Sequence, residues 1–124
     1  MMTVTICGSM RFAEEMKTIA MKLETVIGWN VIQCIYDVPS IITREQHEQL
    51  VMAHYCKIDL SDAIYVVDID GYIGESTQAE ILYAQKQGKN VLYHSKLYPH
   101  YCKRCPEFAF GKDGKYESTN QEED

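Results

Sequence analysis

Residues 63–68, which read Ala-Ile-Tyr-Val-Val-Asp, constrain the fold of this chain more than any other segment. The run is almost entirely apolar, without the alternation of apolar and polar residues that a half-exposed strand shows. Such strands are typical of parallel sheets, because helices cover both faces of these sheets. The sequence on either side of this strand therefore has to supply those helices.

Strand-like and helical patterns alternate along the rest of the chain. β-branched runs predict three further strands over residues 3–7, 30–36 and 90–94. The resulting order, β-α-β-α-β-α-β, favours right-handed crossovers and a parallel sheet. The chain is therefore predicted to form a single-domain, doubly wound α/β fold of the flavodoxin or Rossmann type.

The helices are predicted where apolar residues recur at three- and four-residue steps, over residues 12–27, 43–60 and 76–87. Gly28 is placed to end the first of these helices. Thr43 and Gln46 have the spacing of a capping box, which predicts the start of the second.

The composition limits the partners that we expect. The chain has 124 residues, which is typical of one domain, and a net charge of −6. This acidic balance disfavours nucleic acid or an anionic membrane as a partner. We expect no membrane span or secretory signal, and the odd count of five cysteines indicates reduced thiols in the cytoplasm. The folded domain is expected over residues 1–95, with an irregular extension over residues 96–124 that carries an acidic end.

Ligands of such sheets bind beyond the carboxyl ends of the strands. Three loops are expected to converge there, over residues 8–11, 37–42 and 68–77. We therefore expect the binding site among the side chains of these loops and of the helices that follow them.

The turn after the first strand reads Gly8-Ser9-Met10-Arg11 and leads into a helix. Backbone N–H groups at a helix start favour an anion, and the side chains of Ser9 and Arg11 can add donors. This pattern predicts that Gly8, Ser9 and Arg11 bind a phosphate or sugar hydroxyls. The alternative is a tight turn in which Ser9 caps the helix and Arg11 is solvated.

Glu80 is expected in the first turn of the third helix and has two interpretations. In the first, Thr77 and Glu80 form a capping box, so that the glutamate reaches back to a backbone N–H. In the second, Glu80 is a nucleophile that attacks the anomeric carbon of a sugar, and the helix N-terminus keeps it ionised.

The loop after the central strand supplies further candidates. Asp68 and Asp70 close the strand and can orient a base or donate a proton, although capping and solvation are equally open for Asp68. Tyr72 can stack on a base, or simply pack as most tyrosines do. Ser76 is a candidate for substrate binding through its hydroxyl.

Histidine and cysteine residues are further candidates for chemistry. His47 and His54 lie seven residues apart on the predicted second helix, where a satisfied interior histidine is the usual outcome. Cys102 and Cys105 form a Cys-x-x-Cys with two histidines nearby, which permits a zinc site although the spacing matches no zinc motif that we can justify. The alternative for this segment is a tail with free thiols.

Two parts of the chain resemble the nucleoside 2-deoxyribosyltransferase superfamily, which includes the deoxynucleoside 5′-monophosphate N-glycosidases. Residues 6–11, Ile-Cys-Gly-Ser-Met-Arg, resemble the Gly-Ser-Ile-Arg turn of the monophosphate hydrolases. Residues 59–68, followed by Glu-Ile-Leu-Tyr-Ala at 80–84 and Gly-Lys-Asn-Val at 88–91, resemble the core block of the superfamily. The likeness spans residues 3–95.

The resemblance implies a reaction and a set of residues. Glu80 matches the nucleophile, and Ser9 and Arg11 match the turn that meets the sugar or phosphate. The superfamily cleaves N-glycosidic bonds of deoxynucleosides or their monophosphates without a metal or other cofactor, in homo-oligomers that share sites. The chain departs from the pattern at Gly74 and Leu82, where the family usually has aspartate and glycine.

Three hypotheses follow. The first is an N-glycosyl hydrolase or 2-deoxyribosyltransferase, in which Asp68 or Asp70 assists the base. The second is a non-catalytic module of the same fold that senses a nucleotide. The third is a metal-dependent interaction protein that uses Cys102 and Cys105. We expect the first, with a small nucleoside or nucleotide as its partner.

Overall fold

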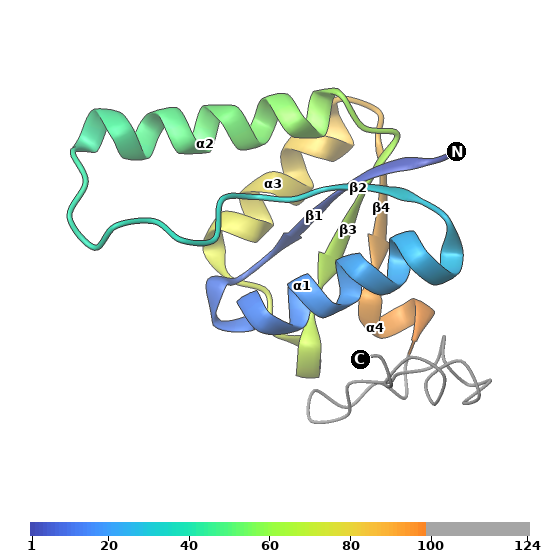
Figure 1. Ribbon diagram of the computed structural model, residues 1–124. Coiled ribbons are helices and arrows are strands. Elements are labelled where there is room, and N and C mark those ends of the chain that lie inside the picture. The colour runs from blue at the N-terminus through green and yellow to red at the C-terminus, as the bar shows by residue number, and fades with distance from the viewer. Residues whose placement is uncertain (99–124) are drawn as a thin grey trace.

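Four parallel strands lie between two layers of helices in the computed structural model, which describes residues 1–98 (Figure 1). The strands are β1 (Thr3–Gly8), β2 (Asn30–Ile32), β3 (Ala63–Val67) and β4 (Asn90–Tyr93). Their order in the sheet is β2-β1-β3-β4, and every neighbouring pair is parallel. The predicted α/β fold with a flavodoxin- or Rossmann-like parallel sheet is therefore confirmed.

The helices cover both faces of this sheet. They are α1 (Ala13–Lys22), α2 (Arg44–Asp59), α3 (Glu75–Lys86) and α4 (His94–Leu97). A π-helical turn, Leu23–Ile27, continues α1, and short 3-10 turns lie at Met10–Phe12 and Ile69–Gly71. α1 packs on one face, and α2 and α3 lie on the other (Figure 1). Gly28 ends the first helical segment with a φ of 87°, a left-handed conformation that favours glycine, as predicted.

The hydrophobic core has two halves, one on each face of the sheet. Val4 and Ile6 of β1 pack with α1, whereas Cys7 packs with α2 and α3. This division follows from strand geometry, because successive side chains of a strand point to opposite faces. All five residues of β3 are buried, which confirms the two-sided strand that its apolar run predicts.

The second strand is shorter than predicted. The sequence predicts a strand over residues 30–36, but β2 contains only Asn30–Ile32, which pair with residues 3–5 of β1. β2 lies at the edge of the sheet, so it has one neighbouring strand alone, and the chain leaves the sheet after Ile32. Residues 37–43 and the first half of α2 then extend from the body of the protein; we call this region the arm (Figure 1).

The start of α2 confirms the predicted capping box. The backbone N–H of Gln46 donates to Thr43 Oγ1 at 3.0 Å, and the backbone N–H of Thr43 donates to Gln46 Oε1 at 2.9 Å. These two bonds satisfy backbone donors that the helix itself leaves unpaired.

Part of the predicted C-terminal extension lies outside the described residues, including Cys102, Cys105 and the acidic end. Within residues 1–98, α4 crosses the domain boundary expected at residue 95. Of the helices described there, none combines the length and the apolar character that crossing a membrane requires.

Candidate active site

A cleft of about 860 Å³ opens beyond the carboxyl ends of β1 and β3. Gly8 and Val67, the last residues of the two strands, are paired neighbours at this edge. The chain leaves β1 toward β2 on one side and returns to β3 on the other, so the direction of winding reverses between β1 and β3. Ligands of doubly wound sheets bind at this reversal, so the cleft has the location expected of a binding site.

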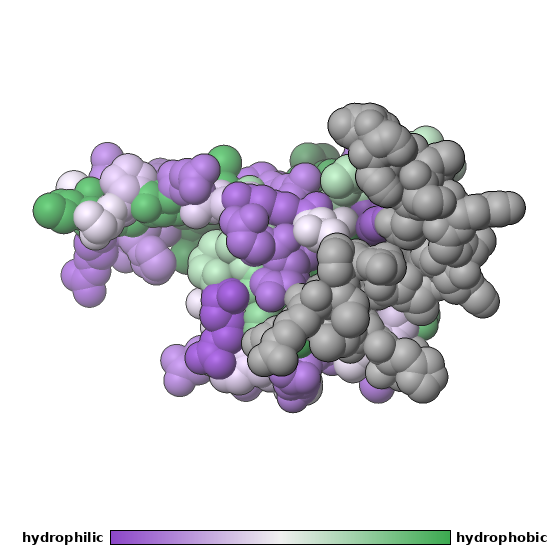
Figure 2. All heavy atoms as spheres, turned by 60° about the horizontal axis from the view of Figure 1, so that its bottom comes forward, coloured by the Kyte–Doolittle hydropathy of each residue, from purple (hydrophilic) through white to green (hydrophobic). Residues whose placement is uncertain are grey.

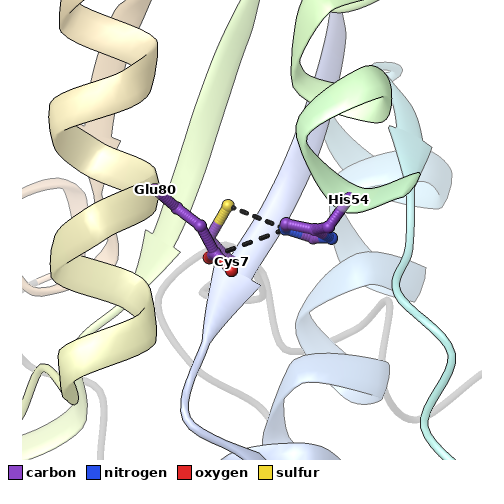
Figure 3. A group of neighbouring side chains, drawn as sticks. All are labelled: Cys7, His54 and Glu80. Carbon is purple, nitrogen blue, oxygen red and sulfur yellow. Dashed lines mark hydrogen bonds and ion pairs between the residues drawn. The ribbon is translucent and has the colours of Figure 1, made fainter. Parts of the chain in front are cut away.

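Three side chains from three elements meet in the wall of the cleft: Cys7 of β1, His54 of α2 and Glu80 of α3 (Figure 3). Cys7 Sγ lies 3.4 Å from His54 Nε2, and Glu80 Oε1 lies 3.6 Å from the same nitrogen. The Cys7 residue is 1% exposed, and the side chains of His54 and Glu80 are 11% and 17% exposed. The cluster is therefore nearly dry but open toward the cleft.

Local structure explains why these three side chains converge. Cys7 follows Ile6 in β1, so strand alternation turns it toward α2 and α3 rather than toward α1. His54 precedes buried Ile58 by four residues on α2, and Glu80 precedes buried Ala84 by four residues on α3. Residues four apart share one face of a helix, so the packing that buries Ile58 and Ala84 also turns His54 and Glu80 inward.

Burial controls the ionisation of this cluster. It raises the pKa of Glu80 to about 7, and a contact with the Cys7 thiol opposes only part of this shift. Burial, assisted by the charge of Lys57, lowers the pKa of His54 to about 4. Burial and then the nearby Glu80 carboxylate raise the pKa of Cys7 well above its usual range. At neutral pH, His54 and Cys7 are therefore uncharged and Glu80 is poised between its two forms.

Glu80 does not have the position predicted for it within α3. The helix begins at Glu75 with Gly74 as its N-cap, so Glu80 lies in the second turn. Thr77 is a buried helical residue, and the predicted capping box of Thr77 with Glu80 is wrong. The expectation that a helix N-terminus keeps Glu80 ionised is wrong as well, because burial raises the pKa of this carboxyl.

Four predicted binding residues line the cleft together with Glu80: Gly8, Ser9, Tyr72 and Ser76. The backbone at Gly8 lies close to the side chain of Met16, since a Cβ at this position would be 3.1 Å from Met16 Sδ. Glycine therefore fits here better than a residue with a side chain.

The turn that follows Gly8 also has the structural role that the alternative interpretation predicts for Ser9. Ser9 Oγ accepts a hydrogen bond from the backbone N–H of Arg11 at 3.2 Å and so caps the first helical turn. The Arg11 guanidinium lies 3.8 Å from the centre of the Tyr72 ring, outside the described lining of the cleft.

Neither Asp68 nor Asp70 belongs to the described lining of the cleft, contrary to the placement predicted for them. The buried Asp68 carboxylate accepts hydrogen bonds from the backbone N–H and the hydroxyl of Ser95, at 2.8 and 2.6 Å, and so holds the start of α4. Asp70 is exposed in a 3-10 turn with a φ of 55°. Asp68 directly precedes this turn and Asp70 lies within it, so the chain after β3 places neither carboxylate in the lining that contains Glu80.

Sequence reasoning missed the cluster itself. His54 is buried, as the interior interpretation predicts, but its Nε2 faces Cys7 and Glu80. Cys7 has no sequence motif that marks it for chemistry, although its place directly before Gly8 puts it at the carboxyl end of a strand. His47, an exposed residue two turns before His54 on α2, also lines the cleft. Cys7 lies 47 positions before His54 and 73 positions before Glu80 in the chain. Local sequence patterns do not report contacts over such separations, so only the fold reveals this cluster.

The geometry argues against a thiol nucleophile served by a catalytic triad. In a triad, the nucleophile and the orienting carboxylate contact opposite nitrogens of the histidine. Here Cys7 and Glu80 both face Nε2 of His54, and the thiol is buried with a raised pKa. The cluster instead offers a carboxylate nucleophile at the cleft, or three donor atoms for one metal ion, since these atoms lie within 4.8 Å of one another.

Comparison of the chain with models of known families, with curated proteins and with solved structures found no match. The resemblance to the deoxyribosyltransferase superfamily therefore stays a prediction from a small number of motif residues.

Proposed function

We propose that the protein cleaves the N-glycosidic bond of a 2-deoxyribonucleoside or its monophosphate, with Glu80 as the nucleophile. The observation that carries this proposal is the position of the Glu80 carboxyl, which lines a cleft at the carboxyl ends of β1 and β3 instead of capping its own helix. It also accounts for the motif residues that resemble the nucleoside 2-deoxyribosyltransferase superfamily.

The walls of the cleft suit a sugar with a polar substituent. Ser9 and Ser76 offer hydroxyls, Lys57 offers a positive charge, and Tyr72 offers an aromatic ring. The backbone N–H groups at the start of α3 lie on the same side and can meet a phosphate or a sugar oxygen. The volume of about 860 Å³ is ample for a nucleoside monophosphate.

The proposed reaction forms and breaks one bond at the anomeric carbon in each of two steps. A Glu80 oxygen attacks this carbon, the bond to the base nitrogen breaks, and its electron pair leaves with the base, which takes up a proton. Water then attacks the anomeric carbon of the glycosyl ester, loses a proton, and releases the free sugar and the Glu80 carboxylate. If a second base attacks in place of water, the product is a new nucleoside and the enzyme is a transferase.

The proton for the leaving base does not come from Asp68, because its carboxylate is engaged by Ser95 away from the cleft. The titratable side chains that line the cleft beside the Cys7 cluster include Glu75 and His47. We assign the proton donor to one of these two residues.

The test incubates the protein with a panel of deoxynucleosides and their monophosphates and measures the release of free base by chromatography. Glu80→Gln is expected to lower kcat/KM by about 1,000-fold or more, because a neutral amide cannot act as the carboxylate nucleophile. Glu14→Gln is the matched control, since Glu14 is an exposed glutamate of α1 outside the described lining of the cleft. If no substrate of the panel releases base, the enzymatic proposal is wrong.

The same panel tests the second candidate, a nucleotide-binding module without turnover. A specific observation favours it: the two carboxylates expected to assist the base, Asp68 and Asp70, are absent from the described lining of the cleft. This candidate predicts saturable binding by calorimetry, weakened in Ser9→Ala, with no base released.

We also propose a homo-oligomer that forms through the arm. Supporting this, residues of the arm line an apolar groove of about 720 Å³, among them Val38, Ile41 and Leu50. Ile41 is 88% exposed, and hydrophobic atoms are visible along the arm on the left of Figure 2. Light scattering should show that Ile41→Glu shifts the oligomer toward monomer, whereas Leu82→Glu, at an apolar site 63% exposed on α3, does not. A monomeric wild-type chain would contradict this proposal.

We infer a cytoplasmic location as well. Supporting this, Cys7, Cys34 and Cys56 are free thiols among the described residues, which suits a reducing compartment. Localisation of the tagged full chain in intact cells tests this inference.

A further inference from the structure

We propose that Cys7, His54 and Glu80 form a binding site for a thiophilic divalent cation of the zinc class, and that the bound ion withdraws Glu80 from glycosyl transfer. The metal site rests on the geometry and chemistry of its three donors, whereas its inhibitory effect rests on the proposed function.

The spacing of the donor atoms fits a tetrahedral ion. Zinc binds sulfur at about 2.3 Å and imidazole nitrogen or carboxylate oxygen at about 2.0–2.2 Å. At tetrahedral angles, these bond lengths separate sulfur from nitrogen by about 3.6 Å and nitrogen from oxygen by about 3.4 Å. The observed distances are 3.4 Å from Cys7 Sγ to His54 Nε2 and 3.6 Å from that nitrogen to Glu80 Oε1.

The three donors also point toward one common position. Figure 3 shows the side chains of Cys7, His54 and Glu80 converging from a strand and two helices. A donor and acceptor relay would use both nitrogens of the imidazole, but Nε2 alone faces the thiol and the carboxyl. Donor atoms that lie within 4.8 Å of one another around one point are the arrangement that an ion requires.

The charges of the donor set match a divalent cation. When ionised, the thiolate of Cys7 and the carboxylate of Glu80 carry two negative charges, and His54 binds metal as a neutral imidazole. Burial opposes the ionisation of both acids in the absence of a cation. A bound divalent ion neutralises the pair, and the soft thiolate favours zinc over magnesium or calcium.

The site has the composition of an open metal centre. Three protein ligands leave a fourth tetrahedral position, as in zinc sites that bind water or another small ligand. Glu80 lines the cleft, so this position is reached from the solvent side. An ion there holds the Glu80 oxygen that would otherwise attack the sugar, so metal binding and glycosyl transfer compete for one residue.

The test uses the full chain carrying Cys102→Ser and Cys105→Ser, which removes the other predicted thiol site. Titration with Co²⁺ alone is expected to give a thiolate-to-cobalt charge-transfer band and the visible bands of a tetrahedral ion. Competition with a chromophoric chelator then measures the affinity for Zn²⁺. Cys7→Ser should abolish the charge-transfer band, and Cys56→Ser, at an exposed cysteine of α2, should preserve it.

Glu80→Gln provides a second variant in case Cys7→Ser fails to fold. This variant should keep the charge-transfer band, because Cys7 is still present. It should also weaken zinc binding by more than about 100-fold, since loss of a residue that only supports a metal ligand costs about 10–100-fold. If the background chain binds no Co²⁺ or Zn²⁺, or if the band survives in a folded Cys7→Ser variant, the metal site is refuted.

The inhibitory effect is measured separately. One equivalent of Zn²⁺ should abolish base release, and a chelator should restore it. Activity that is unchanged or raised by bound Zn²⁺ would refute the inhibition. A chain that binds the metal but releases no base from any substrate would refute the proposed function and leave the metal site established.

Discussion

Replacing Glu80 with glutamine should change the pH dependence of stability by an amount that the structure sets. Burial raises the pKa of this carboxyl from 4.5 to about 7, while its side chain is only 17% exposed. Each pH unit of such a difference corresponds to about 1.4 kcal/mol, so ionising Glu80 in the folded state costs about 3 kcal/mol.

The direction follows from proton binding. Above pH 4.5 the unfolded chain loses the Glu80 proton, whereas the folded chain keeps it until pH approaches 7. Wild-type stability therefore falls through this window because of Glu80, and the loss is complete above pH 7. Glutamine cannot ionise, so Glu80→Gln should gain about 2–3 kcal/mol relative to wild type between pH 5 and pH 8.

Urea denaturation at these two pH values measures the effect as a difference between variant and wild type. His54, whose pKa is lowered to about 4, contributes stability that rises with pH, but it is present in both proteins and largely cancels. Glu14→Gln, at an exposed position of α1, should leave the difference constant within about 0.5 kcal/mol. A pH-independent difference for Glu80→Gln would show that this carboxyl is not held in the dry wall of the cleft.

Three further predictions follow from other contacts. Base release should rise with pH through an apparent pKa of about 7, since only ionised Glu80 attacks; a pH-rate profile that is flat from 5 to 9 would contradict this. Asp68→Asn should lower the free energy of unfolding by about 1–3 kcal/mol, measured by urea denaturation, because it weakens the hydrogen bonds from Ser95. Steady-state kinetics should show an unchanged KM. Thr43→Ala should cost about 1 kcal/mol through loss of the capping bond to Gln46, again by urea denaturation, and should not alter base release.

Features that depend on nearest neighbours along the chain could be predicted from the sequence. The order of strands and helices follows from apolar spacing, and Gly28 ends the first helix because a left-handed residue is needed there. The capping box of Thr43 and Gln46 depends on two residues three apart, so its pattern is visible without any fold.

Features that depend on tertiary contacts could not be predicted in the same way. The run over 30–36 is a good strand sequence, but only one neighbouring strand is available and the pairing stops at Ile32. Thr77 and Glu80 also have capping-box spacing, yet the helix begins at Glu75 and Thr77 lies buried within it. The central strand ends at Val67, one residue before the predicted end, and Asp68 follows it, where hydrogen bonds from Ser95, distant in sequence, hold its carboxylate.

The state of Glu80 was predicted wrongly because two opposing effects had to be compared. A helix N-terminus stabilises a carboxylate by about 0.3–1 kcal/mol, and this effect fades beyond the first turn. Glu80 lies in the second turn and is largely buried, so desolvation dominates and raises its pKa to about 7. A carboxyl with this pKa gives up its proton near neutrality, as both a nucleophile and a ligand for a divalent ion must. The position of Glu80 in the second turn excludes a capping role, and its burial moves the loss of its proton from acid pH to near neutrality.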